Sequence, residues 1–457
     1  MSVLRRCTLC VASCTVLGAC GDSPWNNPYH AEEAKNNTLY SAFEERPKYL
    51  DPARSYSSNE YLFIAQIYEP PLQYHFLKRP YQLVPLAAAA TPTVRYFDDA
   101  GKTLTADAAG VTYSEYVVDI RPGMLYQPHP ALARDKTGRY RYHALSAEDL
   151  EGVHTLADFA ERGTREVVAE DYVYQIKRLA NPKNHSPIGG LMQGYIVGFG
   201  EFSERLERAY GAIESSSATY LDLRRYAMPG AVVLDRYRYK LRIKGKYPQF
   251  IYWLAMPFFA PMPWEAERFY LQTGMEQRNI TLNWFPLGSG PFMLTENNPN
   301  LRMVLERNPN FHEEHYPSEG MQGELNPEAD AGNRLPLIDR AVFSLEKEDI
   351  PYWNKFLQGY YDSSGIGSDS FDQAIQFDQG AAEVTDSMRA KGIKLETAVS
   401  TSVLYMGFNM RGPLVGGLSE RARKLRRAIS IAVDFEEFIS IFTNGRGLIA
   451  QGPIPPG

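Results

Sequence analysis

Apolar side chains along the chain follow two periods. In three segments they recur every three or four residues, and this spacing predicts helices at 59–69, 169–179 and 420–444. In four other segments they alternate with polar residues or form short runs rich in β-branched and aromatic residues, which predicts strands at 38–43, 112–126, 232–245 and 337–348. Helices and strands interleave without a short repeat. The pattern therefore favours an α/β or α+β fold with mixed sheets.

Charge placement supports the helix at 169–179. Val173 and Ile176 lie on one side of it, acidic residues occupy positions 170–171 in its first turn, and basic residues occupy positions 177–178 in its last turn. This arrangement complements the helix dipole, which is positive at the first turn and negative at the last.

The pattern at 420–444 is long and amphipathic, and we expect a break in it near Asp434. The Gly-Arg-Gly at 445–447 predicts the end of the helix, because glycine just after the last turn is a common stop signal.

The composition describes a folded chain of 457 residues, long enough for two or three domains. Hydrophobic residues make up 44%, which is ample for a core, and no segment beyond the N-terminal region approaches a membrane span. The net charge is −6 without a long basic run, so we expect no nucleic-acid partner. The 30 tyrosines suit strand and core positions, and they also suit pockets for polar organic ligands.

All four cysteines lie between positions 7 and 20. A structural zinc site needs four ligands, commonly as two close pairs, but only Cys7 and Cys10 have the C-x-x-C spacing. Cys14 and Cys20 form no second pair of this kind, and no cysteine remains downstream to form a disulfide with the rest of the chain. We therefore expect neither a metal site nor a disulfide framework here.

The same segment has the features of a targeting sequence. Basic residues at 5–6 precede an apolar stretch at 7–17, whose eleven residues are too few to cross a bilayer. The Leu-Gly-Ala-Cys that follows, ending at Cys20, resembles the lipobox of bacterial lipoproteins. The resemblance implies cleavage before Cys20 and lipidation of its thiol, so that lipid alone anchors the mature chain. An ordinary cleaved secretory peptide with incidental cysteines is the alternative.

Three motifs raise the question of catalysis, and none has the required spacing. "HEEH" at 312–315 separates its histidines by three positions instead of the four of zinc proteases, and the prolines at 309 and 317 favour a solvated loop. "GSGPF" at 288–292 lacks the order of a nucleophile elbow, so we assign its glycines to a tight turn. "GIGSDS" at 365–370 has no lysine to reach a phosphate. We predict no enzyme, no metal and no cofactor.

Six segments, read in order, resemble one known family. They include "YLDPARSYSSNEYLFIAQIYEPPL", "YVVDIRPGMLYQ" and "LGSGPFMLTE", and their positions are 49–72, 83–94, 116–127, 167–187, 287–311 and 405–456. Together they resemble the bacterial extracellular solute-binding proteins of family 5, which serve oligopeptide, dipeptide and nickel ABC transporters. Each match alone is weak, and their shared order carries the resemblance.

The resemblance implies a periplasmic-binding-protein-like fold of type II, an α/β fold with two lobes, mixed sheets flanked by helices, and an extra subdomain. It implies the following divisions: a signal peptide at 1–19, a tether at 20–36, a first lobe at 37–57 and 190–408, an inserted subdomain at 58–189, and the start of a second lobe at 409–457. The family pattern continues past Gly457, so we expect a truncated chain in which the second lobe is largely missing. Residues 128–166 are an additional charged segment, which we expect to be exposed.

The resemblance also implies a ligand site between the lobes, where relatives hold peptides extended by backbone hydrogen bonds. The predicted ligand-binding residues are Ser55, Tyr56, Ser57, Ser58, Asn59, Pro187, Ile188, Tyr405 and Asn409. Two of them depart from the family: Tyr56 stands where some peptide binders have an acidic residue, and Ile188 where many have a tyrosine. Ser57 and Ser58 can instead cap the helix that follows, and Asn409 can satisfy backbone groups of the hinge.

These departures leave the ligand class open. Peptides delivered to an ABC importer are the leading hypothesis, and a nickel chelate, haem or a sugar are alternatives. A degenerate envelope scaffold without a transport role, or a hydrolase, would be a function of another class. The implied partners are a peptide or related polar solute and the permease subunits, the implied location is the periplasm, and we expect a monomer at full length.

Overall fold

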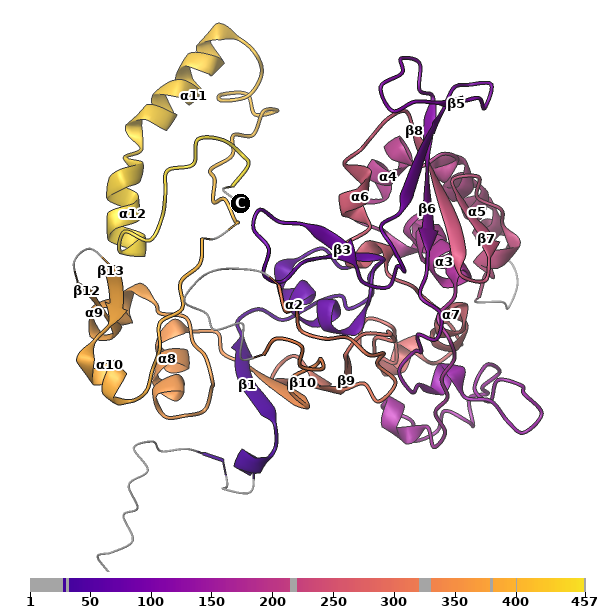
Figure 1. Ribbon diagram of the computed structural model, residues 1–457, viewed down its shortest axis with the longest axis horizontal. Coiled ribbons are helices and arrows are strands. Elements are labelled where there is room, and N and C mark those ends of the chain that lie inside the picture. The colour runs from indigo at the N-terminus through magenta and orange to yellow at the C-terminus, as the bar shows by residue number, and fades with distance from the viewer. Residues whose placement is uncertain are drawn as a thin grey trace, which may run out of the picture. The chain divides into compact units, whose positions relative to one another are not determined.

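The computed structural model describes residues 28–29, 33–213, 220–319, 330–378, 381–399 and 401–455. The chain divides into two compact units (Figure 1). The larger unit comprises Ala34–Leu345, and the smaller unit comprises Glu346–Gly457 with the segment before Ala34. In the described part of the chain, no helix combines the length and the apolar character that crossing a membrane requires.

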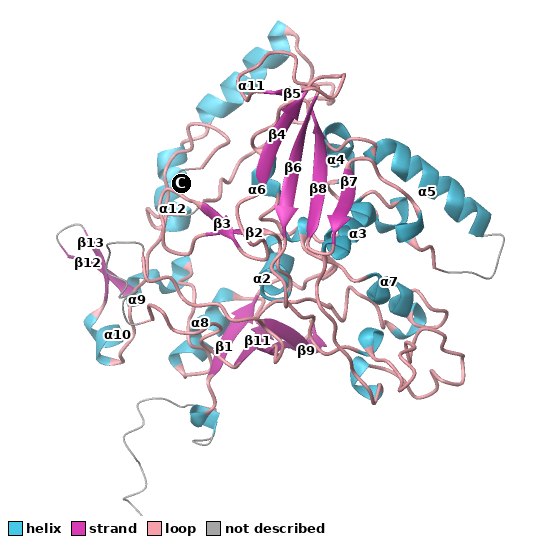
Figure 2. Cartoon of the chain, turned by 45° about the vertical axis from the view of Figure 1, so that its right-hand side comes forward, coloured by secondary structure: helices cyan, strands magenta, loops and turns pink. Residues whose placement is uncertain are grey.

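A five-stranded antiparallel sheet forms one half of the larger unit. Its strands, in the order β5-β4-β6-β8-β7, are β5 (Thr103–Leu104), β4 (Thr93–Phe97), β6 (Tyr113–Asp119), β8 (Arg238–Lys244) and β7 (Ala231–Asp235). Helix α3 (Ala169–Leu179) lies against β7 and β8 (Figure 2), and Tyr172 of this helix stacks on Tyr239 at 5.5 Å. The helix has the bounds that its charge pattern predicts.

The single strand predicted at 232–245 is wrong, because this segment folds into the hairpin β7–β8. The carboxylate of Asp235 accepts a hydrogen bond from the backbone N–H of Tyr237 at 3.0 Å, which closes the turn. The sheet pairs β8 with β6 along its whole length. This sheet therefore includes residues beyond 189, the position at which the sequence predicts the end of the inserted subdomain. The lobe boundaries themselves stay predictions.

A four-stranded mixed sheet forms the other half of the larger unit. Its order is β1-β11-β10-β9, with β1 (Thr38–Phe43), β11 (Arg340–Leu345), β10 (Arg302–Arg307) and β9 (Phe292–Asn298). Strands β1 and β11 run parallel, and the other pairs are antiparallel. Helix α2 (Ser58–Ile67) places Phe63 between Phe43 and Phe343, with ring centroids at 5.8 and 5.2 Å. The predicted strands at 38–43 and 337–348 and the predicted helix at 59–69 are confirmed.

Shorter elements complete the larger unit. They are β2 (Leu72–Tyr74), β3 (Leu83–Pro85), α4 (Gly189–Tyr195), α5 (Phe199–Ile213), α6 (Phe250–Trp253) and α7 (Trp264–Tyr270). Strands β2 and β3 pair as a hairpin, and α4 contacts both α5 and β8.

The expectation that 128–166 is exposed is wrong for several of its large apolar residues. Leu132, Leu150 and Phe159 are at most 5% exposed and belong to the main core. The ring of His129 lies 2.8 Å from the hydroxyl of Tyr270 on α7, within a hydrogen bond. The charged residues of the segment conceal these anchors in the sequence, because its apolar positions follow neither a helical nor a strand period.

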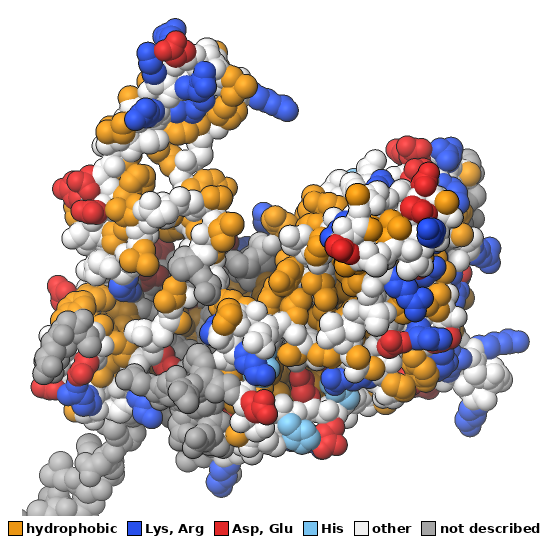
Figure 3. All heavy atoms as spheres, turned by 45° about the horizontal axis from the view of Figure 1, so that its top comes forward, with side chains coloured by type: hydrophobic (Ala, Val, Ile, Leu, Met, Phe, Trp, Pro, Cys, Tyr) orange, Lys and Arg blue, Asp and Glu red, His pale blue; other side chains and the backbone are white. Residues whose placement is uncertain are grey.

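The smaller unit has its own core, formed by Trp353, Phe371, Ala374, Ile375 and Met388. Around it lie α8 (Asp349–Leu357), α9 (Phe371–Ala374), α10 (Asp386–Ala390) and the hairpin of β12 (Ile375–Asp378) and β13 (Ala381–Val384). The amphipathic segment near the end forms α11 (Glu420–Ala432) and α12 (Phe435–Thr443). Figure 3 shows hydrophobic and basic side chains together along this segment.

The break predicted near Asp434 is confirmed. The Asp434 carboxylate accepts a hydrogen bond from the backbone N–H of Glu437 at 2.9 Å and so caps α12. Helix α12 ends at Thr443, where Asn444 takes the left-handed conformation with a φ of 52°. Gly445 follows with a φ of 76° and donates its N–H to the Ile439 carbonyl at 3.1 Å, so the predicted glycine completes the end of the helix.

Candidate functional site

A buried arginine links the two loops of the larger unit that the sequence assigns to the ligand site. Arg178, in the last turn of α3, is 2% exposed. Its guanidinium donates to both carboxylate oxygens of Asp51 at 2.9 and 2.7 Å, and to Glu267 at 2.7 Å. Burial alone would lower the pKa of Arg178, but the charges of Asp51 and Glu267 raise it above its usual value. The guanidinium therefore stays charged inside the protein.

Glu60 fixes the loop that precedes α2. Its carboxylate accepts hydrogen bonds from the backbone N–H groups of Lys48, Tyr49, Tyr56 and Ser57, at 3.1, 2.8, 2.9 and 3.3 Å. Burial opposes the charged form, but the hydrogen bonds favour it, and together they hold the pKa of Glu60 below its usual value. One ionised side chain thus sets the path of the whole loop.

The five predicted residues of this loop have different surroundings. Ser55 is 3% exposed, Tyr56 is 74% exposed, Ser57 is the exposed N-cap residue of α2, Ser58 is exposed in its first turn, and Asn59 donates to the carbonyl of Arg46 at 3.1 Å. Ser57 occupies the N-cap position of α2, and its backbone N–H donates to the Glu60 carboxylate at 3.3 Å; whether Ser57 and Ser58 contact a ligand stays a prediction. Tyr56, Ser57 and Ser58 are the members of this group that present their side chains to solvent.

The second loop is attached to the same arginine. The side-chain amide of Asn184 donates to the carbonyl of Arg178 at 3.0 Å, and Asn181 caps the short 3-10 helix at Pro182–Asn184. Pro187 is exposed, whereas Ile188 is only 3% exposed and packs into the core. Both predicted loops of the larger unit are thus attached to Arg178. Of the two predicted residues in the second loop, Pro187 is exposed and Ile188 is buried.

The remaining predicted residues lie elsewhere. Tyr405 and Asn409 belong to the smaller unit. Tyr405 is 86% exposed, and the Asn409 side-chain oxygen accepts from the backbone N–H of Arg411 at 3.0 Å. Cys20 lies outside the described residues. The roles of these three residues stay predictions.

The "HEEH" segment is a loop, as predicted, but its first histidine is not solvated. The ring of His312 lies 2.6 Å from the carboxylate of Glu69, and their side chains are 14% and 2% exposed. Burial raises the pKa of Glu69. Burial also opposes protonation of His312, but the hydrogen bond and the charge of Glu69 outweigh it, so the pKa of His312 is raised. Among the described residues, no three His, Cys, Asp or Glu side chains are arranged to hold a metal ion.

The glycines of "GSGPF" serve close packing. The backbone N–H of Gly290 donates to the carbonyl of Ile67, at the end of α2, at 2.8 Å. A Cβ atom on Gly288 would lie 1.9 Å from the same carbonyl oxygen. The motif therefore has a structural role, as predicted. Its glycines are needed for the close approach of the 288–290 backbone to the end of α2, and not for a tight turn.

Exposed tyrosines form a surface that the sequence pattern does not reveal. Tyr61 on α2, Tyr74 on β2 and Tyr252 on α6 are 53%, 44% and 48% exposed. Partial burial and the neighbouring Tyr252 and Tyr61 raise the pKa of Tyr74, and Tyr81 packs edge-on against Tyr74 at 5.9 Å. Four rings from different parts of the chain thus gather on the larger unit. Their faces and hydroxyls suit contact with an organic ligand.

Comparison with known families identifies the class to which this fold belongs. Residues 163–457 match the profile described as "Bacterial extracellular solute-binding proteins, family 5 Middle". This match covers more than half of the chain, so the chain belongs to that family, and the predicted resemblance is confirmed. No curated protein matches the chain.

Solved structures with the same fold include peptide-binding proteins. OppA of Burkholderia pseudomallei is 15% identical with a TM-score of 0.56, and the likeness covers 93% of this chain and 61% of OppA. DppA of Helicobacter pylori, solved with the peptide STSA, and Listeria monocytogenes OppA bound to peptide are each 15% identical, with TM-scores of 0.55 and 0.54 and coverage of 93% of this chain and 62% of theirs. These likenesses confirm the predicted α/β fold class. The chain spans about three fifths of the length of these proteins.

Proposed function

We propose that this chain captures peptides as the substrate-binding component of an ABC importer. Its membership of a solute-binding family supports a binding role, and the peptide complexes among proteins of the same fold suggest the ligand class. The observation that carries the proposal is the exposure of Tyr56, Ser57, Ser58 and Pro187, predicted contact residues on two loops. The buried Asp51–Arg178 pair and the Asn184–Arg178 hydrogen bond attach these loops to the end of α3.

The geometry suits recognition of a peptide backbone. Glu60 and Arg178 hold the loops in place before any ligand arrives, so little conformational entropy is lost on binding. The hydroxyls of Ser57 and Ser58 can exchange hydrogen bonds with peptide groups, and the ring of Tyr56 offers an apolar face. Peptide backbone groups are the same in every sequence, so a site of this kind would accept many peptides.

A titration tests the ligand class. We expect tri- to pentapeptide mixtures to give saturable heat on calorimetric titration, and nickel chelates, haem and sugars to give none. Tyr56→Ala should weaken peptide binding at least threefold, because the 74% exposed ring contributes little to the fold. Leu301→Ala is the matched control, since Leu301 is a 62% exposed residue of the β9–β10 turn. Saturation by a chelate, haem or sugar alone would refute the peptide proposal.

We further propose that the protein binds without performing chemistry on its ligand. Peptides recovered after prolonged incubation should have unchanged masses. Appearance of hydrolysis products that scale with protein concentration would show a peptidase instead.

We also propose that the protein works in the periplasm, held there by lipid on Cys20. The observation that motivates it is the Leu-Gly-Ala-Cys sequence ending at Cys20. Cys20→Ala should move the protein out of the membrane fraction or block its processing, without changing the melting temperature. Membrane attachment as strong as that of the unmodified sequence would contradict the anchor.

A further inference from the structure

Four tyrosines of the larger unit form an exposed surface that the predicted peptide contacts do not include. They are Tyr61 on α2, Tyr74 on β2, Tyr81 in the turn before β3 and Tyr252 on α6, and each is between 42% and 53% exposed. Elements α2, β3 and α6 lie side by side in Figures 1 and 2. The backbone N–H of Leu72 on β2 donates to the carbonyl of Leu254, just after α6, at 3.0 Å. We call these four residues the tyrosine surface.

The β2–β3 hairpin holds two of the four rings on a fixed support. The backbone N–H of His75 donates to the carbonyl of Gln82 at 2.8 Å, and its ring accepts from the N–H of Lys78 at 3.1 Å. The guanidinium of Arg79 lies 4.2 Å from the centre of the Tyr81 ring and donates to the carbonyl of Lys78 at 2.9 Å. Little conformational entropy is therefore lost when a ligand contacts these rings.

Contacts to the loop after β10 anchor the same hairpin. Phe76 stacks on Tyr316 with ring centroids 6.2 Å apart, and the side-chain amide of Gln73 donates to the carboxylate of Glu314 at 2.9 Å. The two tyrosines of the hairpin take no part in these contacts. Their rings meet edge-on at 5.9 Å and stay exposed, so they are available to a ligand.

The hydroxyls of the tyrosine surface have unused hydrogen-bonding capacity. Within the part of the chain that the structure describes, none of the four hydroxyls makes a hydrogen bond. Partial burial raises the pKa of Tyr61 and of Tyr74, so both phenols are protonated at neutral pH and can donate a hydrogen bond. The surface thus combines apolar ring faces with unengaged donors.

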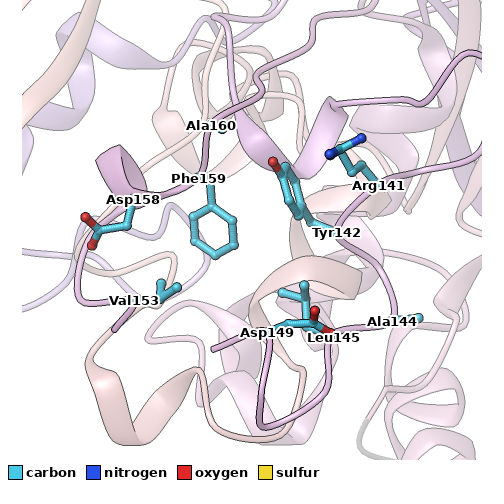
Figure 4. A pocket seen from close by; sticks show the side chains of 9 residues that line it. All are labelled: Arg141, Tyr142, Ala144, Leu145, Asp149, Val153, Asp158, Phe159 and Ala160. Carbon is cyan, nitrogen blue, oxygen red and sulfur yellow. The ribbon is translucent and has the colours of Figure 1, made fainter. Parts of the chain in front are cut away.

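The cavity in the additional segment differs in this respect, because its charged groups are engaged. It lies within residues 141–160 (Figure 4). Asp149 and Asp158 accept hydrogen bonds from backbone N–H groups of their own turns at 2.9 and 2.8 Å. Arg141 lies 3.3 Å from the carboxylate of Glu161, and its guanidinium is 6.0 Å from the centre of the Tyr142 ring. We therefore assign no ligand to this cavity.

The tyrosine surface continues the predicted peptide contacts along α2. Tyr61 follows Ser58 by three positions and Ser57 by four, so the three side chains share one side of the helix. At about 1.5 Å per residue, the step from Ser57 to Tyr61 is about 6 Å along the helix axis. Two peptide residues in the polyproline II conformation span about the same distance. A peptide held at Ser57 therefore reaches the first tyrosine within a few residues.

Exposed rings and hydroxyl donors together favour a proline-containing segment. The pyrrolidine ring is a compact apolar group that packs on an aromatic face. Proline has no N–H, so the surface needs to supply few acceptors. The carbonyls of a polyproline II segment have no partner within the segment, and so they can accept from tyrosine hydroxyls. Aromatic-lined surfaces recognise proline-rich segments in this way in other recognition modules.

We propose that the tyrosine surface is a subsite that selects peptides with a Pro-Pro segment next to the residues held at Ser57 and Ser58. The prolines would pack on the rings of Tyr61 and Tyr74, and the neighbouring peptide carbonyls would accept from their hydroxyls. This inference rests on the proposed peptide-binding role and adds a sequence preference to it.

Calorimetric titration with Ala-Ala-Pro-Pro-Ala and with penta-alanine tests the subsite. We expect the proline peptide to bind at least about fivefold more tightly, because its segment is already rigid and the rings are already in place. The variant Tyr61→Ala/Tyr74→Ala should reduce this preference to less than about twofold and leave the affinity for penta-alanine nearly unchanged. The variant Tyr61→Phe/Tyr74→Phe keeps the rings and removes the hydroxyls, so it should weaken the proline peptide by about two- to threefold.

Leu271→Ala is the matched control, because Leu271 is a 42% exposed residue that follows α7 and is not part of the tyrosine surface. It should bind both peptides like the unmodified protein. Equal affinity for the two peptides, or full preference for proline in both double variants, would overturn the subsite and leave the peptide-binding role standing. Binding of neither peptide would overturn both. A dimer that the alanine double variant converts to a monomer would assign the surface to a second copy of the chain and would also overturn the subsite.

Discussion

Replacing Arg178 by methionine should cost the protein much of its stability. The guanidinium makes three short hydrogen bonds to the carboxylates of Asp51 and Glu267, whose side chains are 5% and 7% exposed. Methionine fills a similar volume but offers no donor. Two carboxylates would then face an apolar interior without a counter-charge, which is the costly way to break a buried ion pair.

We expect a loss of about 3–5 kcal/mol in the free energy of unfolding of the larger unit, the usual cost of removing one partner of a buried pair. Arg302→Met is the matched control. Arg302 binds both oxygens of Glu296 at 3.0 and 2.7 Å, but the two side chains are 46% and 36% exposed. Water replaces the lost contacts there, so we expect a loss of at most about 1 kcal/mol.

Urea unfolding followed by circular dichroism gives the two free energies, and hydrogen exchange in α3 assigns the transition to the larger unit. Adding Asp51→Asn and Glu267→Gln to Arg178→Met should recover part of the loss, because no buried charge then lacks a partner. The reasoning fails if Arg178→Met costs no more than Arg302→Met, or if the triple variant is less stable than Arg178→Met alone.

Two further changes test contacts elsewhere in the larger unit. Gly288→Ala should lower the free energy of unfolding by about 1–3 kcal/mol or more, because its Cβ would lie 1.9 Å from the Ile67 carbonyl oxygen. Gly190→Ala, in open space on α4, is the control and should change this free energy by less than about 1 kcal/mol. Equal melting temperatures of the two variants would contradict the prediction. The pKa of His312 is raised above 6.5. Its contribution to stability is therefore complete below pH 6.5 and is lost as pH rises through the raised value. The raised pKa of Glu69 also makes stability fall as pH rises. The unfolding free energy should therefore fall from pH 6.5 to 8.5, less steeply in His312→Asn, and equal slopes would refute the assignment.

Local patterns predict those elements whose signals lie within a few residues. The helix at Ala169–Leu179 has the predicted bounds because periodicity and end charges agree there. The strand at Thr38–Phe43 has them because its uncharged run is flanked by polar and charged residues. The hairpin at 231–244 is not predicted, since polar and apolar residues alternate from Arg236 to Lys244 and no glycine or asparagine marks the turn before them.

The candidate site depends on contacts that sequence spacing does not contain. Arg178 pairs with Asp51 across 127 positions, and His312 pairs with Glu69 across 243. From the sequence, Arg178 only complements a helix dipole, and His312 belongs to a charged loop. The family resemblance identified the loop positions, but burial decides their roles: Ser55 and Ile188 are enclosed, while Tyr56 and Pro187 are exposed.

The parallel pairing of β1 with β11 sets the order in which the larger unit is completed during synthesis. Thr38 lies opposite Arg340, so about 300 residues must be made between one strand and its partner. At about 5–20 residues per second this takes on the order of 15–60 s. Strand β1 has no β11 to pair with during that time, although the β9–β10 hairpin can already form. Wherever the chain folds, β1 therefore stays without its partner strand until residues 340–345 have also reached that compartment.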